Sequence, residues 1–139
     1  MINLEKKTKE LEGINFVAFS NNVVVVNTTP HPVTIQDMDG TLITVPTSVL
    51  INAKAEERKV SDLFVRIEFV GTEEGKETIE RIKSVYNRQF SNGTLVIVGS
   101  IIAAQAYPGE VAAMTPVEGY ERVAPDQKRM RCDKFTTFA

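Results

Sequence analysis

The feature that most constrains the fold is an apolar strand that runs directly into a proline-rich corner. Four consecutive valines, Val23–Val26, are followed by Asn27-Thr28-Thr29-Pro30-His31-Pro32, which contains the only histidine of the chain. Each proline fixes its own φ and keeps the preceding residue out of the helical region, so the corner is stiff and extended. Such a corner at a strand end suits a small-molecule site, and it is equally an ordinary way for a chain to leave a sheet.

The segments around this corner predict a sheet with several hairpins. Residues 14–19 and 23–27 read as two strands joined by a short turn. Residues 33–36 and 41–45 flank Asp37-Met38-Asp39-Gly40, which is the strongest hairpin signal in the chain. Apolar runs and alternation predict further strands at residues 64–70, 94–98, 111–114 and 128–138.

One amphipathic helix is predicted at about residues 72–88, because Thr72 offers an N-cap and apolar side chains then recur at helical spacing. Residues 101–106 read as a short apolar helix or turn. Residues 1–12 read as a short charged helix, which is too short to be stable alone and is therefore expected to serve oligomerisation. The predicted fold class is α+β, with an antiparallel β-sheet core, one main amphipathic helix and a short N-terminal helix in a single domain, residues 1–139.

The composition narrows the classes of function. A formal net charge of -2 disfavours binding to long nucleic acids, which requires a large basic field. One cysteine and one histidine can form neither an internal disulfide nor a closed zinc site within one chain. No apolar run is long enough to span a membrane, and the first residues lack a signal-peptide core, so we expect a soluble intracellular protein.

Recognised catalytic motifs are missing from the sequence, which has no phosphate-binding glycine loop, nucleophile elbow or metal-ligand pair. Asp37 and Asp39 could act as paired carboxylates, but a hairpin tip favours aspartate for its turn geometry and solvent exposure. His31 would need a partner to act as a general base, and the sequence identifies none. The expectation is therefore a binding protein with no catalytic residue, metal or cofactor.

Basic residues are unevenly distributed along the chain. No lysine or arginine occurs between Gly13 and Ala53. The tail, in contrast, is rich in basic residues, namely Arg122, Lys128, Arg129, Arg131 and Lys134. This local basic patch suits a compact anionic ligand and is too small to follow a nucleic-acid backbone.

Three segments resemble those of small phage-encoded proteins. The corner is similar to their Asn-Leu-Thr-Pro-His-Pro motif, residues 95–106 are similar to their Ile-Val-Ser-x-x-Ala-Gln segment, and Lys128-Arg129-Met130-Arg131-Cys132 resembles their basic, cysteine-containing last strand. Together with the chain length and the charged N-terminal segment, these features resemble the Thoeris anti-defence protein 1 family. Members of that family sequester a cyclic ADP-ribose isomer made by bacterial TIR enzymes, and some also hold cyclic di- or trinucleotides.

Binding such a ligand requires aromatic stacking on the purine, amide hydrogen bonds, and arginines for the pyrophosphate. Arg88, Phe90 and Asn92 follow the main helix closely, and Arg129 and Arg131 are two apart on the last predicted strand, so both point to one face. The first group fits equally well a helix end with a basic residue and a hydrophobic closing contact. The second fits equally well a solvated edge strand protected by charge.

His31 and Gln105 complete the set of candidate ligand-binding residues. Gln105 lies in an alanine-rich segment, where a buried amide would need a partner, either a ligand or a capping or core hydrogen bond. The resemblance implies a non-catalytic sponge for a cyclic ADP-ribose-type signal, acting as a homo-oligomer in the cytoplasm of an infected bacterium. The alternatives are an enzyme that cleaves such a signal and a ligand-free phage structural or assembly module.

Overall fold

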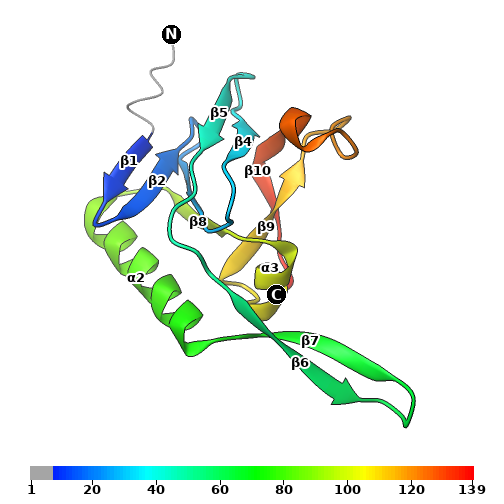
Figure 1. Cartoon of the computed structure of the whole chain (residues 1–139). Helices are drawn as coiled ribbons and strands as arrows, with labels where there is room; N and C mark the ends of the chain where they lie inside the picture. Colours follow the sequence, from blue (N-terminus) through cyan, green and yellow to red (C-terminus); the bar gives the residue numbers. More distant parts are fainter. Residues whose placement is uncertain (1–7) are drawn as a thin grey trace.

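The computed structural model describes residues 8–139, and it has the expected α+β class, with one main helix against a curled sheet (Figure 1). The strands of the main sheet lie in the order β1-β2-β3-β8-β9-β10-β4-β5. A bridge between Asn27, at the end of β3, and Thr47, just after β5, joins segments from distant positions in this order. The sheet therefore curls back on itself and has an inner and an outer side.

Within residues 8–139 the strands are β1 (Thr8–Leu11), β2 (Ile14–Ala18), β3 (Val23–Asn27), β4 (Val33–Gln36), β5 (Leu42–Val45), β6 (Ala53–Lys59), β7 (Val65–Gly71), β8 (Thr94–Val98), β9 (Val111–Pro116) and β10 (Met130–Thr136). The helical elements are α2 (Glu73–Gln89), α3 (Ile101–Ala106) and the 3₁₀ turn η1 (Pro125–Gln127). None of the helices in this part of the chain is long and apolar enough to cross a membrane.

The main sheet is mixed, whereas an antiparallel core was expected. The pairs β1–β2, β2–β3, β4–β5 and β9–β10 are antiparallel, but β3–β8, β8–β9 and β4–β10 are parallel. The parallel β8–β9 pair has a clear cause, because α3 lies between the two strands and returns the chain to the end of the sheet from which β8 began. The hairpin patterns in the sequence contain no information about these longer-range neighbours.

The helix predicted over residues 1–12 is wrong for its last part, because residues 8–11 form strand β1. This strand pairs with β2 and places Leu11 opposite Ile14. The connecting residues, Glu12 and Gly13, both have positive φ, as a two-residue type I′ hairpin turn requires. Backbone bonds to β2 stabilise a segment that would be marginal as a helix. The remainder of that predicted helix, residues 1–7, lies outside the described residues.

Two apolar clusters lie on opposite sides of β3. The outer cluster packs the sheet against α2 and α3 and includes Phe16, Val24, Val26, Ile79, Ile82, Val85, Ile97 and Ala104. The inner cluster fills the curl and includes Val17, Val25, Ile35, Ile43, Val45, Val98 and Cys132. Alternate valines of β3 enter different clusters, so the strand is buried on both faces, as its continuous apolar run indicates.

Helix α2 begins and ends within a residue of its predicted bounds. The Thr72 side chain accepts a hydrogen bond from the Gly75 N–H at 2.9 Å, which confirms the predicted N-cap. At the other end, the backbone N–H of Phe90 donates to the Tyr86 carbonyl, and the chain then becomes extended. The short helix α3 is likewise confirmed, with Ser100 as its N-cap.

Strands β6 and β7 form a separate ribbon that projects from the main sheet (Figure 1). The sequence predicts β7 but not β6, whose residues Ala-Lys-Ala-Glu-Glu-Arg-Lys lack apolar alternation. Tyr107 anchors the base of the ribbon, because its hydroxyl accepts from the Thr72 N–H at 2.9 Å and donates to the Asn52 carbonyl at 2.7 Å. A Cβ at Gly75 would lie 1.8 Å from that hydroxyl, so a glycine is required there.

Candidate functional site

The proline-rich corner after β3 is held by the side-chain amide of Asn27, which is fully buried. The amide nitrogen donates to the carbonyls of His31 at 2.8 Å and Val45 at 3.2 Å. The amide oxygen accepts from the Thr29 N–H at 2.9 Å and from the Thr29 hydroxyl at 2.6 Å. One side chain therefore satisfies four partners, and it fixes the chain path through both prolines.

Thr28 anchors the same corner to strand β8. Its N–H and its hydroxyl both donate to the Val98 carbonyl, at 2.8 and 2.7 Å. Gly99, directly after β8, is closely packed, because a Cβ there would lie 2.6 Å from a Val111 methyl carbon and 3.4 Å from the Thr28 hydroxyl oxygen. His31, in contrast, is exposed and contributes its backbone carbonyl to the corner.

A pocket of about 340 Å³ opens beside this corner, and we call it the corner pocket. Its lining comes from four segments of the chain and comprises Pro32, Val33, Thr34, Met114, Pro125, Asp126, Lys128 and Met130. The parallel pairing of β10 with β4 places the basic tail next to the residues that leave the corner. The volume lies in the range of small-molecule pockets.

The corner pocket combines an apolar wall with two charged side chains. Val33, Met114 and Met130 are partly buried and pack against the inner cluster. Asp126 and Lys128, on and after the η1 turn, provide one carboxylate and one ammonium group. An apolar wall can pack against a planar ring, the ammonium can bind a phosphate, and the carboxylate can accept from hydroxyl or amino groups.

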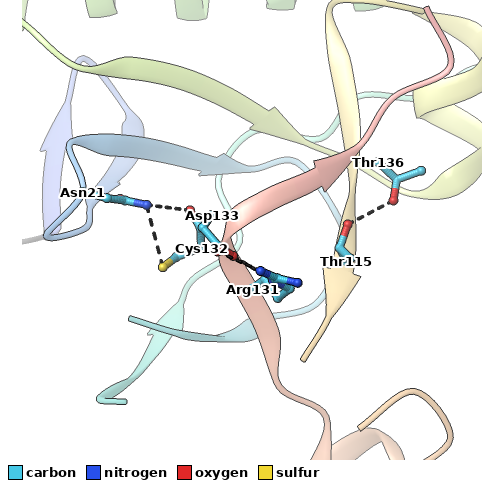
Figure 2. Close-up of polar contacts among 6 residues, drawn as sticks. All are labelled: Asn21, Thr115, Arg131, Cys132, Asp133 and Thr136. Atoms are coloured by element: carbon cyan, nitrogen blue, oxygen red, sulfur yellow. Dashed lines mark hydrogen bonds and ion pairs between the residues drawn. The ribbon is translucent and has the colours of Figure 1, made fainter. Parts of the chain in front are cut away.

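The two arginines predicted to bind phosphate point away from the inner cluster, and each has a partner. Arg131 forms a two-pronged ion pair with Asp133, with two N–O distances of 2.8 Å (Figure 2). The Arg129 guanidinium lies over the Tyr120 ring, 4.7 Å from its centre. Met130, between the arginines, packs against the inner cluster, and Cys132, directly after Arg131, is buried in it, so the predicted alternation of faces is confirmed. The edge-strand alternative is wrong, because β10 lies between β9 and β4.

The ion pair changes the pKa of both Arg131 and Asp133. The hydrogen bond from Arg131 is the main cause that lowers the pKa of Asp133, and the attraction of the positive charge adds to it. The same hydrogen bond is the main cause that raises the pKa of Arg131. Asp133 therefore remains ionised to lower pH than an ordinary aspartate, and the pair persists across the physiological range.

A second pocket, of about 300 Å³, lies beside Arg131 and is predominantly acidic. Its charged lining residues are Asp37, Glu118, Arg131 and Asp133. Three carboxylates against one guanidinium do not suit an anionic ligand. Asp37 is buried, contrary to the solvent exposure expected at the hairpin tip, and its carboxylate accepts from the Ser20 hydroxyl at 2.6 Å. This contact ties the β4–β5 turn to the β2–β3 turn.

The candidates at the end of α2 lie on the outer side of the sheet, and none of them lines the corner pocket. Arg88 was expected just beyond the helix but lies in its last turn, and Phe90 and Asn92 follow it. The Phe90 ring stacks on Tyr86 with centroids 5.0 Å apart and contacts Phe16 at 5.3 Å, so it closes the outer cluster. Arg88 forms an ion pair with Glu12 at 2.9 Å. Asn92 is exposed in the turn before β8. This geometry fits the helix-end interpretation of the segment.

Gln105 is exposed on α3, so the expectation of a buried amide is wrong. Cys132 is buried, and its carbonyl accepts from the Asn21 side chain at 3.0 Å (Figure 2). Within residues 8–139 no cluster of three or more His, Cys, Asp or Glu side chains could hold a metal ion. None of the predicted site residues lines the corner pocket. Three of them, His31, Arg129 and Arg131, are each next in sequence to a residue that does.

Sequence reasoning did not single out Thr34, Met114 and Met130 as lining a pocket. They come from three different strands, and a single-chain pattern contains no signal that β4, β9 and β10 are neighbours. Lys128 belongs to the basic tail that the sequence identifies, but it was not among the candidate ligand-binding residues; it was expected in the last strand and lies instead after the η1 turn, before β10. No family model, curated protein or solved structure matches this chain.

Proposed function

We propose that the protein binds a small anionic nucleotide in the corner pocket and holds it without chemical change. The ligand class follows from the resemblance to the Thoeris anti-defence protein 1 family, and it is a cyclic ADP-ribose isomer or a related cyclic nucleotide. In this proposal the protein acts in the cytoplasm of an infected bacterium, where sequestration of the signal blocks immune signalling.

The observation that carries the proposal is the meeting of two unusual sequence segments at one pocket. Pro32 ends the corner, and Lys128 and Met130 belong to the basic tail, yet all three line the same cavity. The segments are about a hundred residues apart in the chain, so their contact depends on the parallel β4–β10 pair. A stiff corner fixed by a buried amide is well suited to preorganise one wall of a binding site.

The chemistry of the lining assigns a role to each group. The apolar wall of Val33, Met114 and Met130 packs against the purine, and Lys128 neutralises the phosphates as a point charge. Asp126 accepts hydrogen bonds from a ribose hydroxyl or from the amino group of the base. Arg129 and Arg131 support this site indirectly, because their contacts with Tyr120 and Asp133 order the segment that runs from Lys128 into β10.

The proposal is tested by incubating the protein with cyclic ADP-ribose isomers, removing unbound ligand, denaturing the protein, and identifying what is released by chromatography. Release of intact ligand supports the proposal. Release of a cleaved product indicates an enzyme, and retention of nothing indicates a structural or assembly role; either result would overturn it. Linear ADP-ribose under the same conditions provides the control for general nucleotide binding.

A further inference from the structure

The ribbon β6–β7 presents an apolar face that no other part of the described chain covers. Val65 and Ile67 lie on one face of β7, and each is about half exposed. At the tip, Leu63 is 83% exposed and Phe64 is 66% exposed. These are the most exposed large apolar side chains in residues 8–139, and their clustering on one projecting element indicates an interaction surface.

The opposite face of the ribbon is closed by its own ion pairs. Arg58 on β6 pairs with Glu68 across the ribbon and with Glu56 on its own strand. Near the tip, Lys59 pairs with Asp62 at 3.1 Å. Lys59 stands opposite Val65 and Glu57 stands opposite Ile67 in the strand register, so these two charged side chains share the face of Val65 and Ile67. The polar face is thus suited to water, whereas the other face combines exposed apolar side chains with one positive and one negative charge. A two-stranded ribbon alone is marginally stable in water, so a partner on the apolar face would stabilise it.

Helix α3 continues the exposed apolar surface at the base of the ribbon. It packs against both β6 and β7, and Tyr107 at its C-terminal end holds the two strand bases. On the same helix, Ile101 is 61% exposed and Ile102 is 44% exposed. Exposed isoleucines therefore lie on both β7 and α3, which pack against each other.

We infer that this surface, the ribbon's apolar face together with α3, is where a second copy of the chain binds. The charges of the ribbon argue for a second copy over an acidic or basic partner, because residues 53–71 carry four positive and four negative side chains. A surface of zero net charge exerts little electrostatic attraction on a charged partner. An apolar patch present on every copy is, in contrast, self-complementary in a two-fold contact.

The size of the surface explains why α3 belongs to it. A seven-residue strand is about 24 Å long and neighbouring strands lie about 4.8 Å apart, so one ribbon face falls short of the about 800 Å² that each partner buries in a stable interface. The exposed isoleucines of α3 extend the patch toward that size. In the inferred contact each copy contributes both elements, and the ribbon of one covers apolar surface of the other.

Sedimentation velocity tests this inference, with the wild-type chain compared with a Phe64→Ser/Ile67→Ser variant over micromolar concentrations. The control is Leu42→Ser, which removes an exposed apolar side chain from β5, away from the ribbon. We expect the wild type and the control to be oligomeric, and the ribbon variant to be monomeric or to dissociate at least a hundredfold more readily. Circular dichroism of all three chains should be the same, because the changed side chains are exposed.

A monomeric wild type would overturn the inference, as would a ribbon variant that associates like the wild type. A monomeric wild type that binds lipid vesicles through the ribbon would assign the surface to a membrane instead. The inference does not depend on the proposed ligand, so loss of nucleotide binding with association retained, or the reverse, separates the two proposals.

Discussion

Replacing Asn27 by alanine should destabilise the protein more than any surface substitution in the corner. The amide makes four hydrogen bonds. When it is removed, the single proton of the Thr29 hydroxyl can turn to the His31 carbonyl, 2.9 Å away, so these two groups satisfy each other. The Val45 carbonyl and the Thr29 N–H then lose their bonds without replacement. At about 1 kcal/mol for each bond, the expected loss is about 2 kcal/mol in the free energy of unfolding.

The assay is urea-induced unfolding, supported by thermal melting. For a chain of this size a loss of about 2 kcal/mol corresponds to a fall in melting temperature of roughly 7 °C. His31→Ala is the matched control, because the exposed imidazole is outside the amide network, and it should melt within about 2 °C of the wild type. An Asn27→Ala variant as stable as the wild type, or a His31→Ala variant as unstable as Asn27→Ala, would refute the structural role assigned to the amide.

Asn27→Asp tests the direction of the same bonds. The carboxylate keeps the two acceptor contacts with Thr29, but it faces the carbonyls of His31 and Val45 with negative charge. Burial and these carbonyls should raise the pKa of the new carboxyl in the folded state. The stability lost in the Asn27→Asp variant should therefore be smallest at a pH below the pKa that this carboxyl has in the unfolded chain. The loss should grow as the pH rises through the pKa that it has in the folded chain. A penalty that grows on acidification would contradict this assignment.

Three further predictions concern the surroundings of the site. Arg131→Ala should return the pKa of Asp133 toward its ordinary value, which carboxyl-carbon NMR titration measures. Since that pKa is lowered in the folded chain, the pair stabilises the fold at neutral pH, and this stabilisation is lost as the pH falls through the lowered pKa. An unchanged Asp133 titration in the variant would contradict the pairing. Gly99→Ala should cost about 1–3 kcal/mol in urea unfolding, because the new methyl group meets Val111 at 2.6 Å, and a neutral effect would show that the contact relaxes freely. Phe90→Ala should cost about 3 kcal/mol of stability and leave the ligand affinity of the folded fraction unchanged by calorimetry, whereas a stable variant with weakened binding would place the ring at the ligand.

Local patterns predict the elements whose stability is local. The N-cap and apolar spacing of α2, the turn residues of the β4–β5 hairpin and the valine run of β3 all mark structures that form where the sequence indicates. The segments that were missed depend on a neighbour. β1 is a strand because β2 offers it backbone partners, and β6 is a strand because β7 lies beside it. Their charged sequences contain no alternation from which this could be read.

The candidate site was predictable only in part for the same reason. The corner residues are recognisable from the prolines, and the basic tail from its charge. The pocket exists because β10 lies between β9 and β4, and no local pattern encodes that order. The sequence shows the charge of the arginines but not their partners. In the folded chain Arg131 pairs with Asp133 and Arg129 lies over the Tyr120 ring, and Lys128 is the basic residue that lines the pocket.

The most direct test of the central claim is calorimetric titration of cyclic ADP-ribose isomers into the wild type, Lys128→Glu and Lys134→Glu. Lys134 lies exposed on β10, six residues further along the chain, and does not line the corner pocket, so it controls for the change in net charge. A charge-assisted bond to phosphate contributes about 1.5–3 kcal/mol, so we expect Lys128→Glu to weaken binding by roughly 10- to 150-fold and Lys134→Glu to bind like the wild type. Equal affinity in all three chains, or no binding to the wild type, would contradict the corner pocket as a nucleotide site.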